Sequence, residues 1–130
     1  MGECASMAKT LSEADVSTFA GLVGDFNPLH FDPEYARRSR VGRRTAHPTL
    51  AVGLISTLLD NTLPGPGSVC LSQQMEFLAP IFIGDTITAR VEVTAWQPEK
   101  KLITLRTDCY NQDDRQVITG QAVLMVSPLR

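Results

Sequence analysis

An aspartate and a histidine lie close together in the segment Gly24–Asp32, which reads Gly-Asp-Phe-Asn-Pro-Leu-His-Phe-Asp. Asp25 and His30 can act as an acid–base pair, because a carboxylate and an imidazole that share one water can activate it and return a proton nearby. Asn27 can orient the water or a substrate, and Pro28 stiffens the loop between the pair. The spacing also fits a second interpretation, in which Asp25 and Asn27 cap turns and His30 is a hydrogen-bonded loop histidine.

The segment that follows is rich in arginine, with Arg37, Arg38, Arg40, Arg43 and Arg44 in close succession. Guanidinium groups bind phosphates, so this cluster can contact the phosphates of coenzyme A or the phosphopantetheine and acidic face of an acyl carrier protein. A run of charge is also common on a merely solvated surface. The whole chain has 12 Lys and Arg against 14 Asp and Glu, a net charge of −2, which argues against nucleic-acid binding through phosphates.

Length and composition predict one ordinary globular domain over residues 1–130. Apolar residues make up 43% of the chain and charged residues 20%, which is typical of soluble domains with a core of their own. No apolar run approaches the roughly 20 residues of a membrane span, and we expect no membrane partner. The first residues lack the basic start and apolar stretch of a secretory signal.

The cysteines indicate reduced thiols. Cys4, Cys70 and Cys109 are far apart and form no C-x-x-C pair, and the chain has only two histidines. A Cys/His zinc site is therefore not expected. Because free thiols are typical of reducing compartments, we expect a cytoplasmic protein.

Two helices and a loop must position the acid–base pair. Apolar residues recur with helical spacing over Ser12–Val23, whose first residues, Ser-Glu-Ala-Asp, resemble a capping box, and Gly24 is a plausible stop. Asp25–His47 lacks this periodicity and predicts a long loop with one helical turn near Pro33–Arg38. Pro48 to about Asn61 predicts a second helix, buried on most sides because its apolar residues point nearly all round.

The second half of the chain predicts an antiparallel sheet. The expected strands are Val69–Phe77, Thr86–Ala95, Leu102–Tyr110 and Gln116–Val126, with a possible short strand at Ala5–Leu11. Strict alternation in Thr86–Ala95 is typical of a strand with one buried face. A single sheet can bury a nearly all-apolar helix only by curling around it. The fold class is therefore α+β, with a free face or edge that favours pairing with a second copy.

The segment Gly24–Asp32 resembles the hydratase-2 motif of the MaoC-like, (R)-specific enoyl-CoA hydratases. Further landmarks follow in register, namely Ala46-His47, Leu63-Pro-Gly-Pro-Gly-Ser68, Phe77-Leu-Ala-Pro80 and Gly84-Asp85. The resemblance runs over nearly the whole chain. It implies the hot-dog fold, in which a curved antiparallel sheet wraps a long helix, and a homodimer whose active site lies near the dimer interface.

The resemblance implies a hydro-lyase that catalyses reversible syn hydration of a trans-2-enoyl thioester to the (R)-3-hydroxyacyl thioester. In that reaction Asp25 is the general base toward water. His30 shares the water and helps to deliver the proton to the α-carbon, while Asn27 supports the geometry of substrate and water. No metal or redox cofactor is implied, because the thioester supplies the acidity and the electron sink. Coenzyme A or phosphopantetheine enters only as part of the substrate.

One position departs from the family, which usually has His-Gly where this chain has His47-Pro48. The N–H of that glycine is the expected donor to the thioester oxygen, and proline has none. Losing one oxyanion donor costs about 3 kcal/mol of barrier. The amides expected to be unpaired at Thr49 and Leu50, or the Thr49 hydroxyl, can replace it in part. Since Pro48 also suits the first position of a helix, a slower hydratase, a repositioned substrate and an altered reaction all remain open.

The expected substrate-binding residues are His47, Pro48, Thr49, Ser56, Arg43 and Arg44. Among these, we expect His47 to anchor the loop rather than react. Ser56 matches a family serine near the active site, but a serine in an apolar helix often bonds back to the i−4 carbonyl, here that of Val52, and we expect this role. Two other functions stay open: an acyl-thioester-binding protein that has lost efficient chemistry, and a hot-dog thioesterase.

Overall fold

A five-stranded antiparallel sheet forms the centre of the computed structural model. The structure describes residues 1–126, and residues 127–130 of the expected domain lie outside the described residues. The strand order is β1-β3-β4-β5-β2. The strands are β1 (Cys4–Thr10), β2 (Ser68–Phe77), β3 (Thr86–Gln97), β4 (Leu102–Tyr110) and β5 (Gln116–Val126). All five were predicted, and their bounds differ from the predicted ones by at most two residues.

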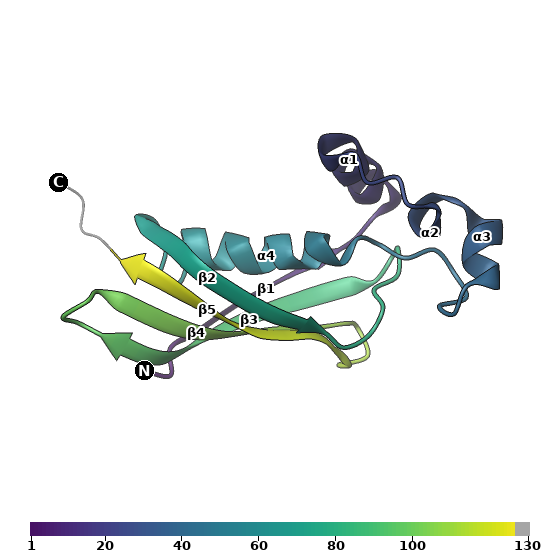
Figure 1. Cartoon of the computed structure of the whole chain (residues 1–130). Helices are drawn as coiled ribbons and strands as arrows, with labels where there is room; N and C mark the ends of the chain where they lie inside the picture. Colours follow the sequence, from purple (N-terminus) through teal and green to yellow (C-terminus); the bar gives the residue numbers. More distant parts are fainter. Residues whose placement is uncertain (127–130) are drawn as a thin grey trace.

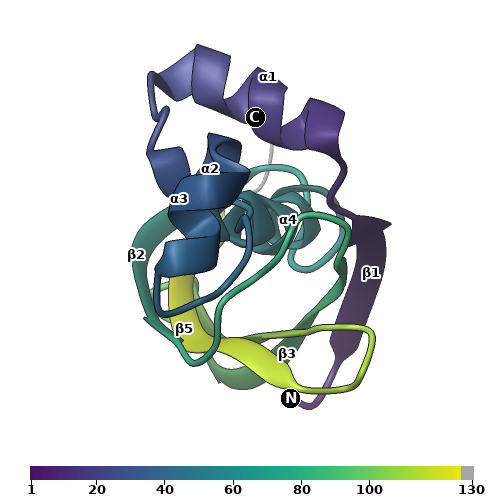
Figure 2. The ribbon, with the colours of Figure 1, turned by 90° about the vertical axis from the view of Figure 1, so that its right-hand side faces the viewer.

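The helix α4 (Pro48–Asn61) lies in the concave side of the sheet, which curls around it (Figures 1 and 2). Alternation in β3 explains this face, because Ile87, Ala89, Val91 and Val93 are buried and their neighbours are not. The helix buries Ala51, Leu54, Ile55, Leu58 and Leu59 against the sheet. The predicted burial on most sides holds except for an exposed strip at Thr49, Gly53 and Thr57.

Helix α1 (Glu13–Val23) stands above the N-terminal end of α4 (Figures 1 and 2). Its predicted capping box is present: the Ser12 hydroxyl accepts from the Asp15 N–H at 3.1 Å, and the Asp15 carboxylate accepts from the Ser12 N–H at 2.9 Å. The helix ends at Gly24, whose φ of 80° is left-handed and therefore favours glycine. This turn sets the direction in which the chain enters the acid–base segment.

The predicted loop 25–47 contains two short helices, α2 (Pro28–Phe31) and α3 (Pro33–Arg38). The turn at α3 was predicted and α2 was not. Both begin with proline at the first position, and each has a side-chain cap: Asn27 for α2 and Asp32 for α3. With α1 they gather at one end of the molecule, beyond the N-terminus of α4 (Figure 1).

Strand β2 runs along the side of α4 (Figure 1), and a glycine on the neighbouring strand β5 lets the two backbones approach closely. Gly120 pairs with Met75, and a Cβ at Gly120 would lie 2.1 Å from the carbonyl oxygen of Gln74. β2 is also an edge of the sheet. It leaves Val69, Leu71 and Phe77 more than half exposed, at 59%, 53% and 51%.

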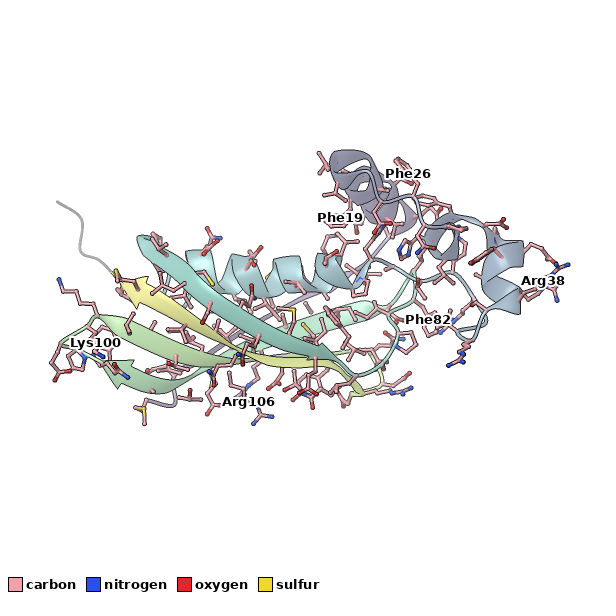
Figure 3. All side chains as sticks on the ribbon, in the orientation of Figure 1. Phe19, Phe26, Arg38, Phe82, Lys100 and Arg106 are labelled. Carbon is pink, nitrogen blue, oxygen red and sulfur yellow. The ribbon has the colours of Figure 1, made fainter. Side chains whose placement is uncertain are left out.

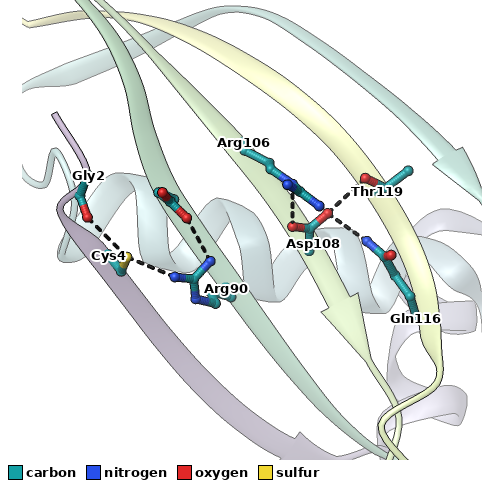
Figure 4. Close-up of polar contacts among 8 residues, drawn as sticks. Gly2, Cys4, Arg90, Arg106, Asp108, Gln116 and Thr119 are labelled. Atoms are coloured by element: carbon teal, nitrogen blue, oxygen red, sulfur yellow. Dashed lines mark hydrogen bonds and ion pairs between the residues drawn. The ribbon is translucent and has the colours of Figure 1, made fainter.

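The face of the sheet away from α4 carries a polar network (Figure 4). The buried carboxylate of Asp108 accepts from Arg106 Nε at 2.8 Å, Gln116 Nε2 at 2.7 Å and Thr119 Oγ1 at 2.8 Å. Burial, helped by the charge of Asp108, raises the pKa of the neighbouring Cys109 thiol to about 12. All three cysteines are free, with Cys4 and Cys70 exposed. Within residues 1–126 no helix has the length and apolar character to cross a membrane.

Candidate active site

His30 is buried on α2 with one ring nitrogen already engaged. Its side chain is 6% exposed, and its Nδ1 lies 2.7 Å from the backbone oxygen of Thr45 and 3.1 Å from the Thr45 hydroxyl. A carbonyl oxygen can only accept, so Nδ1 carries the hydrogen and Nε2 has the free lone pair in the neutral ring. The same contact would also stabilise the ring after Nε2 takes up a proton. His30 is thus prepared to accept a proton and to return it.

Asp25 follows the left-handed Gly24 and presents an accessible carboxylate. Its side chain is 48% exposed. One oxygen, Oδ1, accepts from the N–H of Asn27 at 3.2 Å, which ties the carboxylate to its own loop. The Asn27 side-chain oxygen accepts from the Leu29 N–H at 3.0 Å and so caps α2. The turn-cap interpretation of Asp25 and Asn27 is therefore correct in part, and it does not exclude the acid–base one.

His47 joins this pair from the start of α4. Its ring is 1% exposed, stacks on the ring of His30 with centroids 3.9 Å apart, and has Nε2 3.0 Å from the backbone oxygen of Asp25. The Asp25 carboxylate is 3.9 Å from the same nitrogen. The structure therefore brings Asp25, His30 and His47 together, with a hydrogen bond from His47 to the loop that carries Asp25.

These three residues form a group that could hold a metal ion, since one ligand atom from each lies within 4.8 Å of the others. The Asp25 carbonyl can only accept, however, so His47 Nε2 carries a hydrogen and has no free lone pair. The other nitrogen of His47, Nδ1, is buried, so the group offers one imidazole nitrogen, on His30, and one carboxylate, whereas a catalytic zinc site has three protein ligands. The group is better suited to hold a water between the His30 nitrogen and the Asp25 carboxylate.

A short strap, residues 44–47, holds the loop that carries the pair. Arg44 Nε donates to the His30 backbone oxygen at 2.7 Å, and the Thr45 N–H donates to the Leu29 oxygen at 3.0 Å. The strap is itself fixed, because the Ala46 N–H donates to the Ile81 oxygen at 2.8 Å. Thr45 was missed from the sequence, since a single threonine in a loop gives no signal of what its backbone oxygen contacts.

The N-terminus of α4 offers fewer free amides than expected. Pro48 occupies the first helical position, as predicted. The Leu50 N–H donates to the His47 oxygen at 3.0 Å, so the expectation that it is unpaired was wrong, because the helix begins with a tight turn. The amide of Thr49 has no acceptor within residues 1–126, and Thr49 is exposed. It is the amide that can replace the donor absent at Pro48.

Ser56 does not form the predicted back-bond to Val52. The corresponding bond is made one residue later, where the Thr57 hydroxyl donates to the Gly53 oxygen at 2.9 Å. Within residues 1–126 the Ser56 hydroxyl has no hydrogen bond, and the residue is half-buried. Its hydroxyl is therefore free to contact a ligand.

The arginines differ in how far they are already paired. Arg37 and Arg38 form ion pairs with Glu34, and Arg38 points away from the molecule (Figure 3). Arg44 pairs with Glu13 at 2.6 Å. Arg43 lies over the ring of Phe82 at 3.8 Å and has no carboxylate partner within residues 1–126. Arg37, Arg43 and Arg44 line one hollow of about 400 Å³.

Comparison with known proteins shows the family to which the chain belongs. Residues 4–112 match the MaoC like domain family. The (R)-specific enoyl-CoA hydratase of Rhodospirillum rubrum is 47% identical over 125 residues, 96% of this chain and 86% of that protein. The enzyme of the same name from Aeromonas caviae is 42% identical over 124 residues, 95% of this chain and 92% of that protein. The solved (R)-hydratase from A. caviae involved in PHA biosynthesis has a TM-score of 0.93 at 41% identity, over 97% of this chain and 96% of that one, which confirms the hot-dog fold. The chain belongs to the MaoC-like domain family.

Proposed function

We propose that the protein is an (R)-specific hydratase that interconverts trans-2-enoyl and (R)-3-hydroxyacyl thioesters. The observation that carries this proposal is the contrast between its two acid–base groups. His30 is buried with Nδ1 held by the Thr45 oxygen at 2.7 Å, while the carboxylate of Asp25 is 48% exposed beside it. A water that reaches both groups meets two proton acceptors on one side of a substrate, and this geometry supports syn addition.

In this mechanism Asp25 takes a proton from the water as its oxygen attacks the β-carbon of the enoyl thioester. His30 shares the water: its Nε2 takes up the proton that Asp25 removed and delivers it to the α-carbon on the same face, so that Asp25 is again a carboxylate and His30 again neutral. Thr45 supports the charged ring, because its carbonyl oxygen accepts from Nδ1–H in both states. Asn27 holds the geometry through its cap on α2 and its N–H on the Asp25 carboxylate.

The substrate side of the proposal rests on the N-terminus of α4 and on the arginines. The thioester oxygen would lie at the positive end of this helix, beside Pro48 and the amide of Thr49, with the free hydroxyl of Ser56 further along the helix. Arg43 and Arg44 would face the phosphates of coenzyme A or of a phosphopantetheine arm on an acyl carrier protein. No metal or redox cofactor enters the reaction, because the thioester itself activates the double bond.

We further propose a cytoplasmic homodimer. The free cysteines are consistent with a reducing compartment. The exposed apolar residues on the edge strand β2 support pairing with a second copy, which would place the active site near the dimer interface.

The test is a panel of trans-2-enoyl thioesters on coenzyme A and on acyl carrier protein, with products identified by mass and stereochemistry. Wild-type protein should form (R)-3-hydroxyacyl thioesters, and Asp25→Asn and His30→Ala should each lower turnover by about 10²- to 10⁴-fold while remaining folded. Asp32→Asn is the matched control, because Asp32 is a carboxylate of the same loop whose oxygen caps α3. Full activity in either site variant would exclude the Asp–His mechanism.

Pro48 favours one alternative, a protein that binds acyl thioesters without efficient turnover, because the usual donor N–H is absent there. Tight binding of an enoyl-CoA with no product in the same panel would support it. Release of free coenzyme A would instead indicate a thioesterase.

A further inference from the structure

We propose that His47 is a positioning residue, which acts on the reaction through Asp25 and does not bind substrate. This inference rests on the proposed function and assigns His47 a role within it. In its neutral form the ring of His47 would fix the backbone of the general base, so that the Asp25 carboxylate stays beside His30.

The hydrogen-bond pattern defines the form of His47 that does this. Nε2 lies 3.0 Å from the Asp25 backbone oxygen, so it carries the hydrogen and donates it. Nδ1 is buried and has no partner within residues 1–126. A hydrogen on Nδ1 would be left without an acceptor, which is costly for a buried donor. The surroundings therefore satisfy the tautomer that donates to Asp25.

The ring of His47 is held rigidly enough to serve as a fixed point. It is 1% exposed and packs between His30, with centroids 3.9 Å apart, and Phe19, with centroids 5.0 Å apart. Phe19 reaches it from α1, on the side of that helix that faces α4 (Figure 3). The backbone just before His47 is bonded to Ile81. His47 thus belongs to the rigid core of the molecule although its donor faces the catalytic loop.

Asp25 needs such a contact more than His30 does. His30 is anchored by Thr45 at its ring and by Arg44 at its backbone. Asp25 is exposed and follows a left-handed glycine, and within residues 1–126 its carboxylate accepts a hydrogen bond only from Asn27 of its own loop. The bond to His47 is the hydrogen bond within residues 1–126 that joins Asp25 to the buried part of the site. Losing it would let the carboxylate drift from His30.

The same contacts argue against substrate binding by His47. Its N–H is already engaged, and its free nitrogen is an acceptor enclosed by protein. A thioester oxygen is itself an acceptor and would find no donor on this ring. A substrate ligand should affect KM, whereas a residue that positions the base should affect kcat.

Three variants at His47 test this on the enoyl thioester that the wild type hydrates best. His47→Leu removes the donor, His47→Asn keeps polarity but is too short to reach the Asp25 oxygen, and His47→Gln can place an N–H near the position of Nε2. We expect the first two to lower kcat by roughly 10²-fold with KM changed less than about twofold, because a misplacement near 1 Å costs that much. His47→Gln should recover most of kcat.

A double-mutant cycle separates positioning from a general structural role. If His47 acts through Asp25, His47→Leu should cause no further loss in Asp25→Asn protein. Leu105→Ala is the stability control, since Leu105 is fully buried in β4 away from the site; it should lower the melting temperature and leave kcat unchanged.

The kinetic results separate a failure of this inference from a failure of the proposed function. A raised KM with normal kcat in His47→Leu would make His47 a substrate ligand and overturn the inference, as would normal kinetics in both His47→Leu and His47→Asn or a further loss in the Asp25→Asn background. A wild type that hydrates no enoyl thioester would overturn the proposed function, and the inference with it.

Discussion

The proposed acid–base residues His30 and Asp25 are held in opposite ways. His30 is buried and bonded at both ring and backbone, whereas the Asp25 carboxylate is accessible and bonded within its loop. A buried imidazole with one nitrogen hydrogen-bonded keeps a fixed tautomer, and an exposed carboxylate can meet an incoming water. The two roles proposed for them follow from this difference in environment.

Pro48 is expected to lower the turnover rate of this protein, because it has no backbone N–H to donate. Replacing it by glycine restores a backbone N–H at the first position of α4, next to the free amide of Thr49. If the thioester oxygen lies there, Pro48→Gly should raise kcat on a simple enoyl-CoA by up to about 10²-fold, the usual effect of one oxyanion donor. Steady-state kinetics with a short-chain enoyl-CoA measure this change in kcat.

Pro48→Ala is the matched control for that change. It also restores the N–H but does not add the flexibility of glycine, so the two variants should be accelerated alike if the donor is what matters. Acceleration of Pro48→Gly alone would instead assign the effect to backbone freedom. A lower rate in both would mean that Pro48 is adapted to another substrate or reaction.

The close approach of β2 and β5 depends on one glycine, Gly120, and this gives a prediction for the sheet. A side chain at Gly120 would meet backbone atoms of Gln74 at 2.1 Å and Met75 at 2.9 Å, and backbone atoms of a paired strand cannot move aside as a flexible side chain does. Gly120→Ala should therefore lower the free energy of unfolding by about 1–3 kcal/mol or more. Chemical denaturation measures the change.

Gly53 provides the opposite case within the same chain. It lies in the middle of α4, and an added Cβ would meet nothing within 4 Å. Because alanine favours a helix over glycine by about 0.8–1 kcal/mol, Gly53→Ala should stabilise the protein. Equal effects of the two substitutions would show that the close approach at Gly120 does not limit the fold.

Helices and strands with a long periodic pattern were predicted well from the sequence. Helix α4 was predicted with the bounds that it has, and so were β4 and β5. The α1 cap was predicted from Ser12 and Asp15, because a capping box is a local interaction between residues near in sequence. The sequence pattern was sufficient to predict those elements whose structure depends on residues close together along the chain.

The parts that were missed depend on contacts between distant segments. Helix α2 has four residues, too few to show a periodicity. The role of Thr45 at His30, and the bond from Leu50 to His47 that removes one free amide, arise from backbone atoms that the pattern of side chains does not report. Asp25 and His30 were identified from the sequence because an aspartate and a histidine at this spacing can form an acid–base pair. The strap that aligns them was not.

The whole molecule places the end that carries the proposed active site and its exposed sheet edge on neighbouring surfaces. The helices that carry the site stand at one end of α4, and β2 runs along the side of that helix (Figure 1). Of the two edge strands, β1 and β2, β2 presents the larger apolar surface, through Val69, Leu71 and Phe77. An edge of this length with exposed apolar side chains readily pairs with another strand, so we expect two copies to join there.

This arrangement predicts that the protein sediments as a dimer and that a charge on β2 separates it. Leu71 is 53% exposed and lies at the bulge between Cys70 and Ser72, so a lysine fits the folded monomer but would bring two like charges into a symmetric interface. Leu71→Lys should shift the mass in sedimentation experiments from two chains toward one. Ala8→Lys, on the opposite edge strand, is the control and should remain dimeric. If the second copy also completes the active site, Leu71→Lys should lose hydratase activity along with the dimer, and a fully active monomer would show that one chain forms a complete site.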